Sequence, residues 1–235
     1  ESVVVEFCMR YGNPSTKKTI FKLKELGCNK IVFLPLYPQY SAPTTGTAND
    51  EAFRALMSFK WQPAIRTIPA YFDNPEYIKC LANSILDKYK TLNKEPDHLV
   101  VSYHGVPERY LLAGDPYHCH CQKTTRLLME DLGWGHTKLS TTFQSKFGPG
   151  KWLGPATVDF VSQLAKSGKK NVAVIAPAFS SDCIETLEEI QEEIKDSFLD
   201  SGGEEFTYIE CLNSRSDHIS FLHNLIVNET KGWLS

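Results

Sequence analysis

Short apolar runs without polar alternation recur along this chain, and each is followed by a stretch with apolar residues at helical spacing. The clearest run is Val172–Ala176, in which every residue is apolar. Such a strand is buried on both faces, as in a parallel sheet that is flanked by helices. The pattern therefore predicts an α/β fold with parallel, doubly wound, Rossmann-like sheets.

The alternation of the two patterns locates the expected elements. Asn74-Pro75 is a typical helix start, with an N-cap residue followed by proline, and Gly27 is a typical helix end. The predicted strands lie at 3–7, 30–36, 64–70, 98–103, 137–143, 171–176 and 206–211. The predicted helices lie at 14–26, from about 47, and at 75–89, 118–132, 155–166, 183–198 and 217–227.

The stretch 93–96 has the composition of a linker and divides the chain into two similar α/β domains with a cleft between them. We expect the first domain to cover 1–96 and the second 97–214, and the last helix, in 215–235, to pack back on the first domain. Because 1–96 holds few strands for a doubly wound sheet, we expect an upstream strand and helices to be missing.

Composition narrows the class of protein. A hydrophobic fraction of 42% and a charged fraction of 23% are typical of a globular chain. The net charge is −3 and no basic stripe is present, which argues against a nucleic-acid partner. No apolar run approaches the roughly 20 residues of a membrane span, and no secretory signal is evident. A peripheral membrane contact and the oligomeric state are left open.

The seven cysteines are odd in number and irregular in spacing, which indicates a reduced, cytoplasmic protein. Two of them alternate with histidines at 118–121. Ligands so close together at a helix start cannot all reach one ion, so this stretch is a poor metal site.

Polar and aromatic side chains gather after the predicted strands, where ligands bind in open α/β sheets. His104 follows one strand, and Asp182 and Glu185 follow another. Together with the neighbouring aromatic residues, they suit a large, flat, apolar ligand that undergoes proton transfer or metal chemistry.

Simpler interpretations of the same residues stay open. His104 before a glycine can be a turn histidine, and Asp182 with Glu185 fits a capping box. Glu185 and Glu189 lie one turn apart on an acidic helix, which is more often a solvated face than a proton path or a cation site.

The residues at these strand ends resemble ferrochelatase (protoheme ferro-lyase) of the bacterial type, over the whole chain and in order. The matching stretches in the first half are Met-Arg-Tyr-Gly at 9–12, Leu-Tyr-Pro-Gln-Tyr-Ser at 36–41 and Thr-Thr-Gly at 44–46. Those in the second half are at 102–107 (Ser-Tyr-His-Gly-Val-Pro), 114–117 (Gly-Asp-Pro-Tyr), 143–149 (Phe-Gln-Ser-Lys-Phe-Gly-Pro), 152–155 (Trp-Leu-Gly-Pro) and 179–189 (Phe-Ser-Ser-Asp-Cys-Ile-Glu-Thr-Leu-Glu-Glu).

The resemblance implies insertion of Fe²⁺ into protoporphyrin IX, with release of two protons, as the last step of heme biosynthesis. It implies that His104 is the catalytic base or metal ligand and that Glu185 faces it across the porphyrin, as a second catalytic and metal-binding group. The remaining roles that it implies are a proton or metal path through Asp182, Glu189, Arg10 and Tyr11, and a porphyrin pocket formed by Met9, Tyr117, Trp152 and Phe179.

The chain departs from the family in two respects. Family members carry an upstream segment that this chain lacks, and some ligate a [2Fe-2S] cluster through C-terminal cysteines. No cysteine follows Cys211, so we expect no such cluster and no permanently bound cofactor; iron is a substrate. The alternatives are a chelatase for another tetrapyrrole such as coproporphyrin III, and a non-catalytic porphyrin-binding fragment. A nucleotide-binding protein is a weaker alternative, because no Gly-rich phosphate loop follows a strand.

Overall fold

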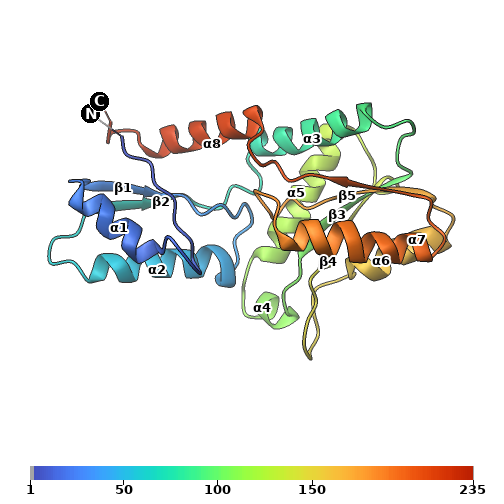
Figure 1. Ribbon diagram of the computed structural model, residues 1–235, viewed down its shortest axis with the longest axis horizontal. Coiled ribbons are helices and arrows are strands. Elements are labelled where there is room, and N and C mark those ends of the chain that lie inside the picture. The colour runs from blue at the N-terminus through green and yellow to red at the C-terminus, as the bar shows by residue number, and fades with distance from the viewer. Residues whose placement is uncertain (1–2, 235) are drawn as a thin grey trace.

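The computed structural model describes residues 3–234, in which strands and helices alternate as predicted (Figure 1). Its strands form two sheets, one with the order β1-β2 and one with the order β4-β3-β5-β6, and every strand pair is parallel. This confirms the parallel α/β class. The strands are β1 (Lys30–Phe33), β2 (Ala64–Thr67), β3 (His98–His104), β4 (Leu139–Gln144), β5 (Asn171–Ile175) and β6 (Glu205–Ile209).

The helices connect these strands, and two segments are π-helical. The first π-helix, η1 (Ala42–Gly46), runs directly into an α-helix, and so does the second, η2 (Glu185–Ile194). The α-helices are α1 (Thr16–Glu25), α2 (Thr47–Met57), α3 (Pro75–Lys90), α4 (Glu108–Leu112), α5 (Tyr117–Leu132), α6 (Thr157–Lys166), α7 (Lys195–Asp200) and α8 (Ser216–Glu229). None of the helices in residues 3–234 combines the length and the apolar character that a membrane span requires.

The four-stranded sheet is covered on both faces, which explains its continuous apolar strands. Leu99 and Val101 of β3 belong to one buried cluster, whereas Val100 between them belongs to the cluster on the opposite face. Alternate residues of a strand point to opposite faces, so an uninterrupted apolar run serves two cores at once. Helices α3 and α5 contribute to the first cluster, and α6 with η2 and α7 to the second.

We call β1, β2, α1, η1 and α2 the first lobe, and the four-stranded sheet with its helices the second lobe. The first lobe has a small core of its own, to which Ile20 of α1, Ile31 of β1 and Ala52 of α2 contribute. Helix α3 precedes the predicted linker but packs against α5 and α8 in the second lobe. Figure 1 shows the two lobes side by side.

The last helix, α8, reaches from the second lobe to the first. Phe221 near its start lies in the core with Tyr71 and Tyr77. Arg66 of β2 donates hydrogen bonds to the main-chain oxygens of Glu229, the last residue of α8, and of Lys231 just beyond it. The predicted domain limits at 96 and 214 stay predictions.

The predicted strand at 3–7 is wrong. This stretch is irregular and largely exposed, with Val5 at 86% and Phe7 at 67% exposure. An apolar run forms a strand only where another strand pairs with it, and within residues 3–234 none pairs with this one. The first helix also begins two residues later than predicted, since Ser15 caps it instead of Asn13.

Candidate active site

His104 is the last residue of β3, at the carboxyl end of the sheet, where the sequence predicted the site. Its Nδ1 lies 2.7 Å from the main-chain oxygen of Gly105. A carbonyl oxygen only accepts hydrogen bonds, so Nδ1 carries the proton in this contact. In the neutral ring the other nitrogen, Nε2, is then unprotonated and is able to accept a proton or bind a metal.

Gln144, at the end of β4, joins this strand end to the start of η2. It is almost fully buried, and its main-chain oxygen accepts a hydrogen bond from the Gly105 amide at 2.7 Å. Its side-chain nitrogen donates to the main-chain oxygen of Glu185 at 2.9 Å and to the Glu189 carboxylate at 3.0 Å. Its side-chain oxygen accepts from Ser102 at 2.7 Å. The side-chain amide of Gln144 therefore links β4, which carries it, to β3 and η2.

The Glu189 carboxylate is held by donors on β4 and the loop after it. Besides Gln144, it accepts hydrogen bonds from the amide of Ser145 at 2.6 Å and from the hydroxyl of Ser145 at 2.5 Å. Ser145 has a φ of 60°, in the left-handed region that few non-glycine residues adopt. Three strong donors make Glu189 an anchored carboxylate rather than part of a solvated face, unlike the exposed Glu188 beside it.

Glu185 is the first residue of η2, and its charge acts on two neighbouring side chains. Burial raises the pKa of the Cys183 thiol to about 11, and a hydrogen bond and the charge of Glu185 add to this effect. Burial also raises the pKa of Tyr37, with further increases from Tyr11 and Glu185 and an opposing effect of Arg10. Tyr37, on the loop after β1, is therefore within electrostatic reach of both Glu185 and the Arg10–Tyr11 pair.

Arg10 and Tyr11 lie on the first lobe. The guanidinium of Arg10 sits 4.4 Å from the centre of the Tyr11 ring and donates a hydrogen bond to Thr47, the first residue of α2. The Tyr11 side chain is largely exposed. Both side chains act on Tyr37 electrostatically, and Leu36 beside Tyr37 accepts a hydrogen bond from Ser180 of the loop after β5.

Two of the predicted porphyrin-binding residues lie beside His104. The rings of Phe179 and His104 are 6.4 Å apart. Trp152 packs over Gly105, where an added Cβ would lie 3.3 Å from its ring, and contacts Phe147 with ring centres 5.2 Å apart. Within residues 3–234, the buried Nε1 of Trp152 has no hydrogen-bond partner.

The other predicted site residues lie in different surroundings. Tyr117 is buried in the core with Tyr103 and Cys121, and burial raises its pKa. Met9 is 46% exposed and forms a single bridge with Ser15. The Asp182 carboxylate accepts hydrogen bonds from Asn213 at 2.6 Å and from Tyr208 at 2.7 Å, which tie it to the loop after β6.

The pKa of Asp182 reflects these contacts. Burial alone would raise the pKa of this carboxyl, but hydrogen bonds from Asn213, Tyr208 and Cys211 outweigh burial and lower it below the ordinary value of 3.8. Asp182 therefore stays ionised near neutral pH.

From the sequence, no role was predicted for Gln144, Ser145 or Tyr37. All three stand immediately after predicted strands, in stretches that match the resemblance. Their place directly after a predicted strand was therefore the one signal of a role in the site. Their uncharged side chains did not indicate which residues they contact.

The histidines and cysteines at 118–121 point to different surroundings. His118 stacks on Phe143, and His120 stacks on Phe72 with ring centres 3.6 Å apart. Cys121 is fully buried, whereas Cys119 is exposed. Nowhere in residues 3–234 do three or more histidine, cysteine or acidic side chains form a group that could hold a metal ion.

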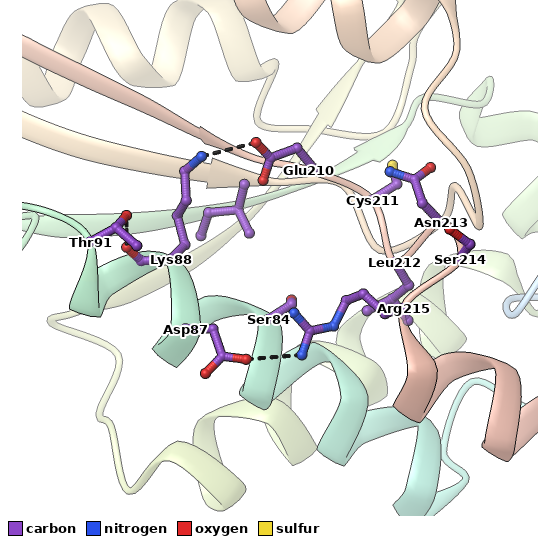
Figure 2. A pocket seen from close by; sticks show the side chains of 11 residues that line it. Ser84, Asp87, Lys88, Thr91, Glu210, Cys211, Leu212, Asn213, Ser214 and Arg215 are labelled. Carbon is purple, nitrogen blue, oxygen red and sulfur yellow. Dashed lines mark hydrogen bonds and ion pairs between the residues drawn. The ribbon is translucent and has the colours of Figure 1, made fainter.

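A hollow of about 490 Å³ lies elsewhere, between α3 and the loop after β6 (Figure 2). The charged side chains in it pair with one another: Lys88 contacts Glu210 at 2.9 Å, and Arg215 contacts Asp87 at 3.0 Å. The candidate site lies instead at the strand ends, where Gln144 links the residue after His104 to the first residue of η2, Glu185.

Comparison with solved structures defines the class of fold. SirB from Bacillus subtilis, solved with Fe³⁺, superposes with a TM-score of 0.68 at 14% identity, over 96% of this chain and 82% of that chain. DR2241 from Deinococcus radiodurans, a multi-domain protein described as structurally similar to chelatases, gives a TM-score of 0.54 at 9% identity, over 91% of this chain and 43% of that chain. At these identities the likeness concerns the fold alone, which is that of the chelatase-like α/β proteins.

Sequence comparison assigns the family. The family model described as ferrochelatase matches residues 1–230. The ferrochelatase of Rhodobacter capsulatus is 58% identical over 233 residues, which are 99% of this chain and 66% of that protein. The ferrochelatase of Agrobacterium fabrum is 52% identical over 233 residues, 99% of this chain and 68% of that protein. The chain belongs to the ferrochelatase family and spans about two thirds of the length of these curated relatives.

Proposed function

We propose that this chain forms the metal-insertion site of a ferrochelatase, which converts protoporphyrin IX and Fe²⁺ to protoheme and two protons in the last step of heme biosynthesis. Family membership supports the reaction. The observation that carries the assignment of residues is the position of His104 at the strand ends, where its Nδ1 contacts the main-chain oxygen of Gly105 and its Nε2 is left for the substrate. We further propose a cytoplasmic location, because all seven cysteines are free and suit a reducing compartment.

The reaction breaks two pyrrole N–H bonds and forms bonds from nitrogen to iron. His104 accepts one proton at Nε2, and the Glu185 carboxylate accepts the other from the opposite side of the ring. Imidazole and carboxylate are also ligands that Fe²⁺ accepts, so the same two groups can hold the ion before it enters the porphyrin. A planar porphyrin blocks the metal, and the site must therefore bind the ring in a bent form.

The surrounding residues fit this division of roles. Trp152 and Phe179 lie beside His104 and offer flat apolar surface to the macrocycle, with Met9 on the first lobe and Tyr117 supporting the site from the core. Fe²⁺ approaches past Arg10 and Tyr11. The released protons leave by way of Glu189 and Asp182, behind Glu185.

Anaerobic insertion of Fe²⁺ into protoporphyrin IX, followed by loss of porphyrin fluorescence, tests this function. We expect turnover by the wild-type chain and at least a roughly tenfold lower kcat in Glu185→Gln, because general acid–base groups contribute about 10²–10⁴ in rate. The matched control is Glu188→Gln, which removes an exposed carboxylate from the same helix and should change kcat by less than twofold. Porphyrin binding without insertion by the wild-type chain would contradict the proposal.

A further inference from the structure

Asp115, on the short loop between α4 and α5, joins the two lobes through a single carboxylate. One carboxylate oxygen, Oδ2, accepts hydrogen bonds from the hydroxyl of Ser41 at 2.9 Å and from the amide of Ala42 at 2.7 Å. The other oxygen, Oδ1, accepts from the amide of Tyr117 at 2.9 Å. Ser41 and Ala42 belong to the first lobe, whereas Tyr117 belongs to the second.

Both amides stand at helix starts. Ala42 is the first residue of η1, which continues into α2, and Tyr117 is the first residue of α5. The first amides of a helix have no partner within it, and a negative charge near them is favourable. Ser41 occupies the N-cap position of η1 but forms no cap bond with its side chain, which donates to Asp115 instead. Asp115 therefore caps one helix in each lobe.

Further bonds hold the same first-lobe segment against α5. The side chain of Gln39 donates to the hydroxyl of Thr124 at 3.1 Å, and the amide of Tyr40 donates to Nδ1 of His120 at 3.1 Å. On the other side, Ser180 donates to the main-chain oxygen of Leu36 at 2.9 Å. Residues 36–42 are thus fixed at both ends by the second lobe, with Tyr37 between the two anchors.

We propose that Asp115 is a positioning residue for the reaction, because it sets the position of the first-lobe segment 36–47 relative to His104 and Glu185. Its effect reaches the site by two routes. It holds the segment that carries Tyr37, and it caps the η1–α2 helix, whose Thr47 accepts the hydrogen bond of Arg10. The consequence for the reaction rests on the proposed function, whereas the placement of the lobes does not.

Asp115→Asn tests the proposal, because an asparagine keeps one acceptor oxygen and replaces the other with an amide nitrogen that cannot accept. The matched control is Asp97→Asn. The Asp97 carboxylate also accepts two main-chain amides, from Lys170 at 2.8 Å and Asn171 at 3.0 Å, but all three residues belong to the second lobe. Ser41→Ala is a milder variant that removes only the hydroxyl bond.

Two measurements distinguish a positioning role of Asp115 from a general effect on the stability of the chain. In Asp115→Asn we expect amide hydrogen exchange in 36–47 to become about tenfold faster, because the segment opens locally more often. We also expect the KM for protoporphyrin to rise about tenfold, which corresponds to about 1.4 kcal/mol of binding free energy. The kcat should change less than threefold. Ser41→Ala should show both effects at about threefold, and Asp97→Asn should show neither, although it lowers the melting temperature.

The proposal is overturned if Asp115→Asn exchanges no faster than wild type in 36–47, or if Asp97→Asn raises the KM equally. Failure of the proposed function has a different signature. In that case the wild-type chain would not insert iron, while the exchange comparison between the variants would still decide whether Asp115 positions the first lobe.

Discussion

The main-chain amide of Gly105 donates to the main-chain oxygen of Gln144 across a distance of 2.7 Å. This bond joins the residue after His104 to the end of the neighbouring strand. The Gln144 side chain in turn holds the start of η2, where Glu185 stands. The two side chains assigned to proton transfer are therefore positioned by one continuous set of hydrogen bonds, and disturbing it at a distance from either should affect both.

Gly105→Ala is expected to disturb this set of bonds. A Cβ at this position would lie 2.7 Å from the Gln144 oxygen and 3.3 Å from the Trp152 ring, so the backbone must move. We expect a loss of about 1–3 kcal/mol in the free energy of unfolding, as for other overpacked sites, together with a lower insertion rate. Urea denaturation measures the first effect. Gly135→Ala is the control, because nothing lies within 4 Å of its Cβ, and an equal loss there would contradict this account.

His104→Ala should abolish insertion and leave porphyrin binding largely intact, because the flat apolar surface of Trp152 and Phe179 remains. We expect a fall of at least about 100-fold in kcat, typical for loss of a general base. Porphyrin fluorescence gives both turnover and the dissociation constant. His223→Ala, which changes an exposed histidine on α8, should behave as wild type. Wild-type turnover in His104→Ala would remove this histidine from the mechanism.

Asp182 should make stability depend on acidity. Its pKa is lowered in the folded chain, so its ionised form contributes stability above the ordinary pKa of 3.8, and this contribution is lost as the pH falls through the lower folded value. Asp182→Asn should be less stable than wild type at neutral pH and lose less stability between about pH 4 and pH 2. Circular dichroism melts at several pH values measure this slope.

The control for the acid dependence is Asp196→Asn, on an exposed position of α7, which should keep the wild-type slope. The lowered pKa of Asp97 and of Asp217 will leave some acid dependence in Asp182→Asn itself. A slope unchanged by Asp182→Asn would show that its hydrogen bonds contribute nothing to the acid response.

Arg66→Ala should detach the end of the chain from the first lobe. Arg66 donates to two main-chain oxygens and lies 4.1 Å from the ring centre of Trp233. Bonds from a charged donor and a cation–π contact together suggest a loss of about 2 kcal/mol. Far-UV circular dichroism during urea unfolding measures it. Arg54→Ala, which breaks only exposed ion pairs on α2, should cost less than about 0.5 kcal/mol, and equal losses would contradict the role of Arg66.

Much of the fold could be predicted because its strongest signals are local. β5 was predicted to within one residue from its continuous apolar run, and α3 from Asn74, whose side chain accepts from the amide of Glu76 as an N-cap does. The strand at 3–7 was wrong because pairing is a relation between segments that no single run reveals. The π-helical form of η2 was also missed, since its apolar spacing resembles that of an α-helix.

The site could be predicted in part for a related reason. Titratable residues such as His104 and Glu185 stand out at strand ends, but their roles were assigned through the resemblance and stay predictions. The contacts of Gln144 and Ser145 depend on the register of β4 beside β3 and on the path of η2, which are tertiary relations. The same holds for Asp115, because its first-lobe partners, Ser41 and Ala42, lie more than 70 residues earlier in the chain.

The parallel order of the second sheet gives the molecule two unlike ends. His104 and Gln144 finish neighbouring strands at one end, whereas His98 and Asn171 begin neighbouring strands at the other. A support or fusion partner attached through the exposed Lys94, just before β3, would therefore hold the chain at the end of the sheet away from the candidate site. An immobilised form anchored there would leave the proposed site at the opposite end of the sheet unobstructed.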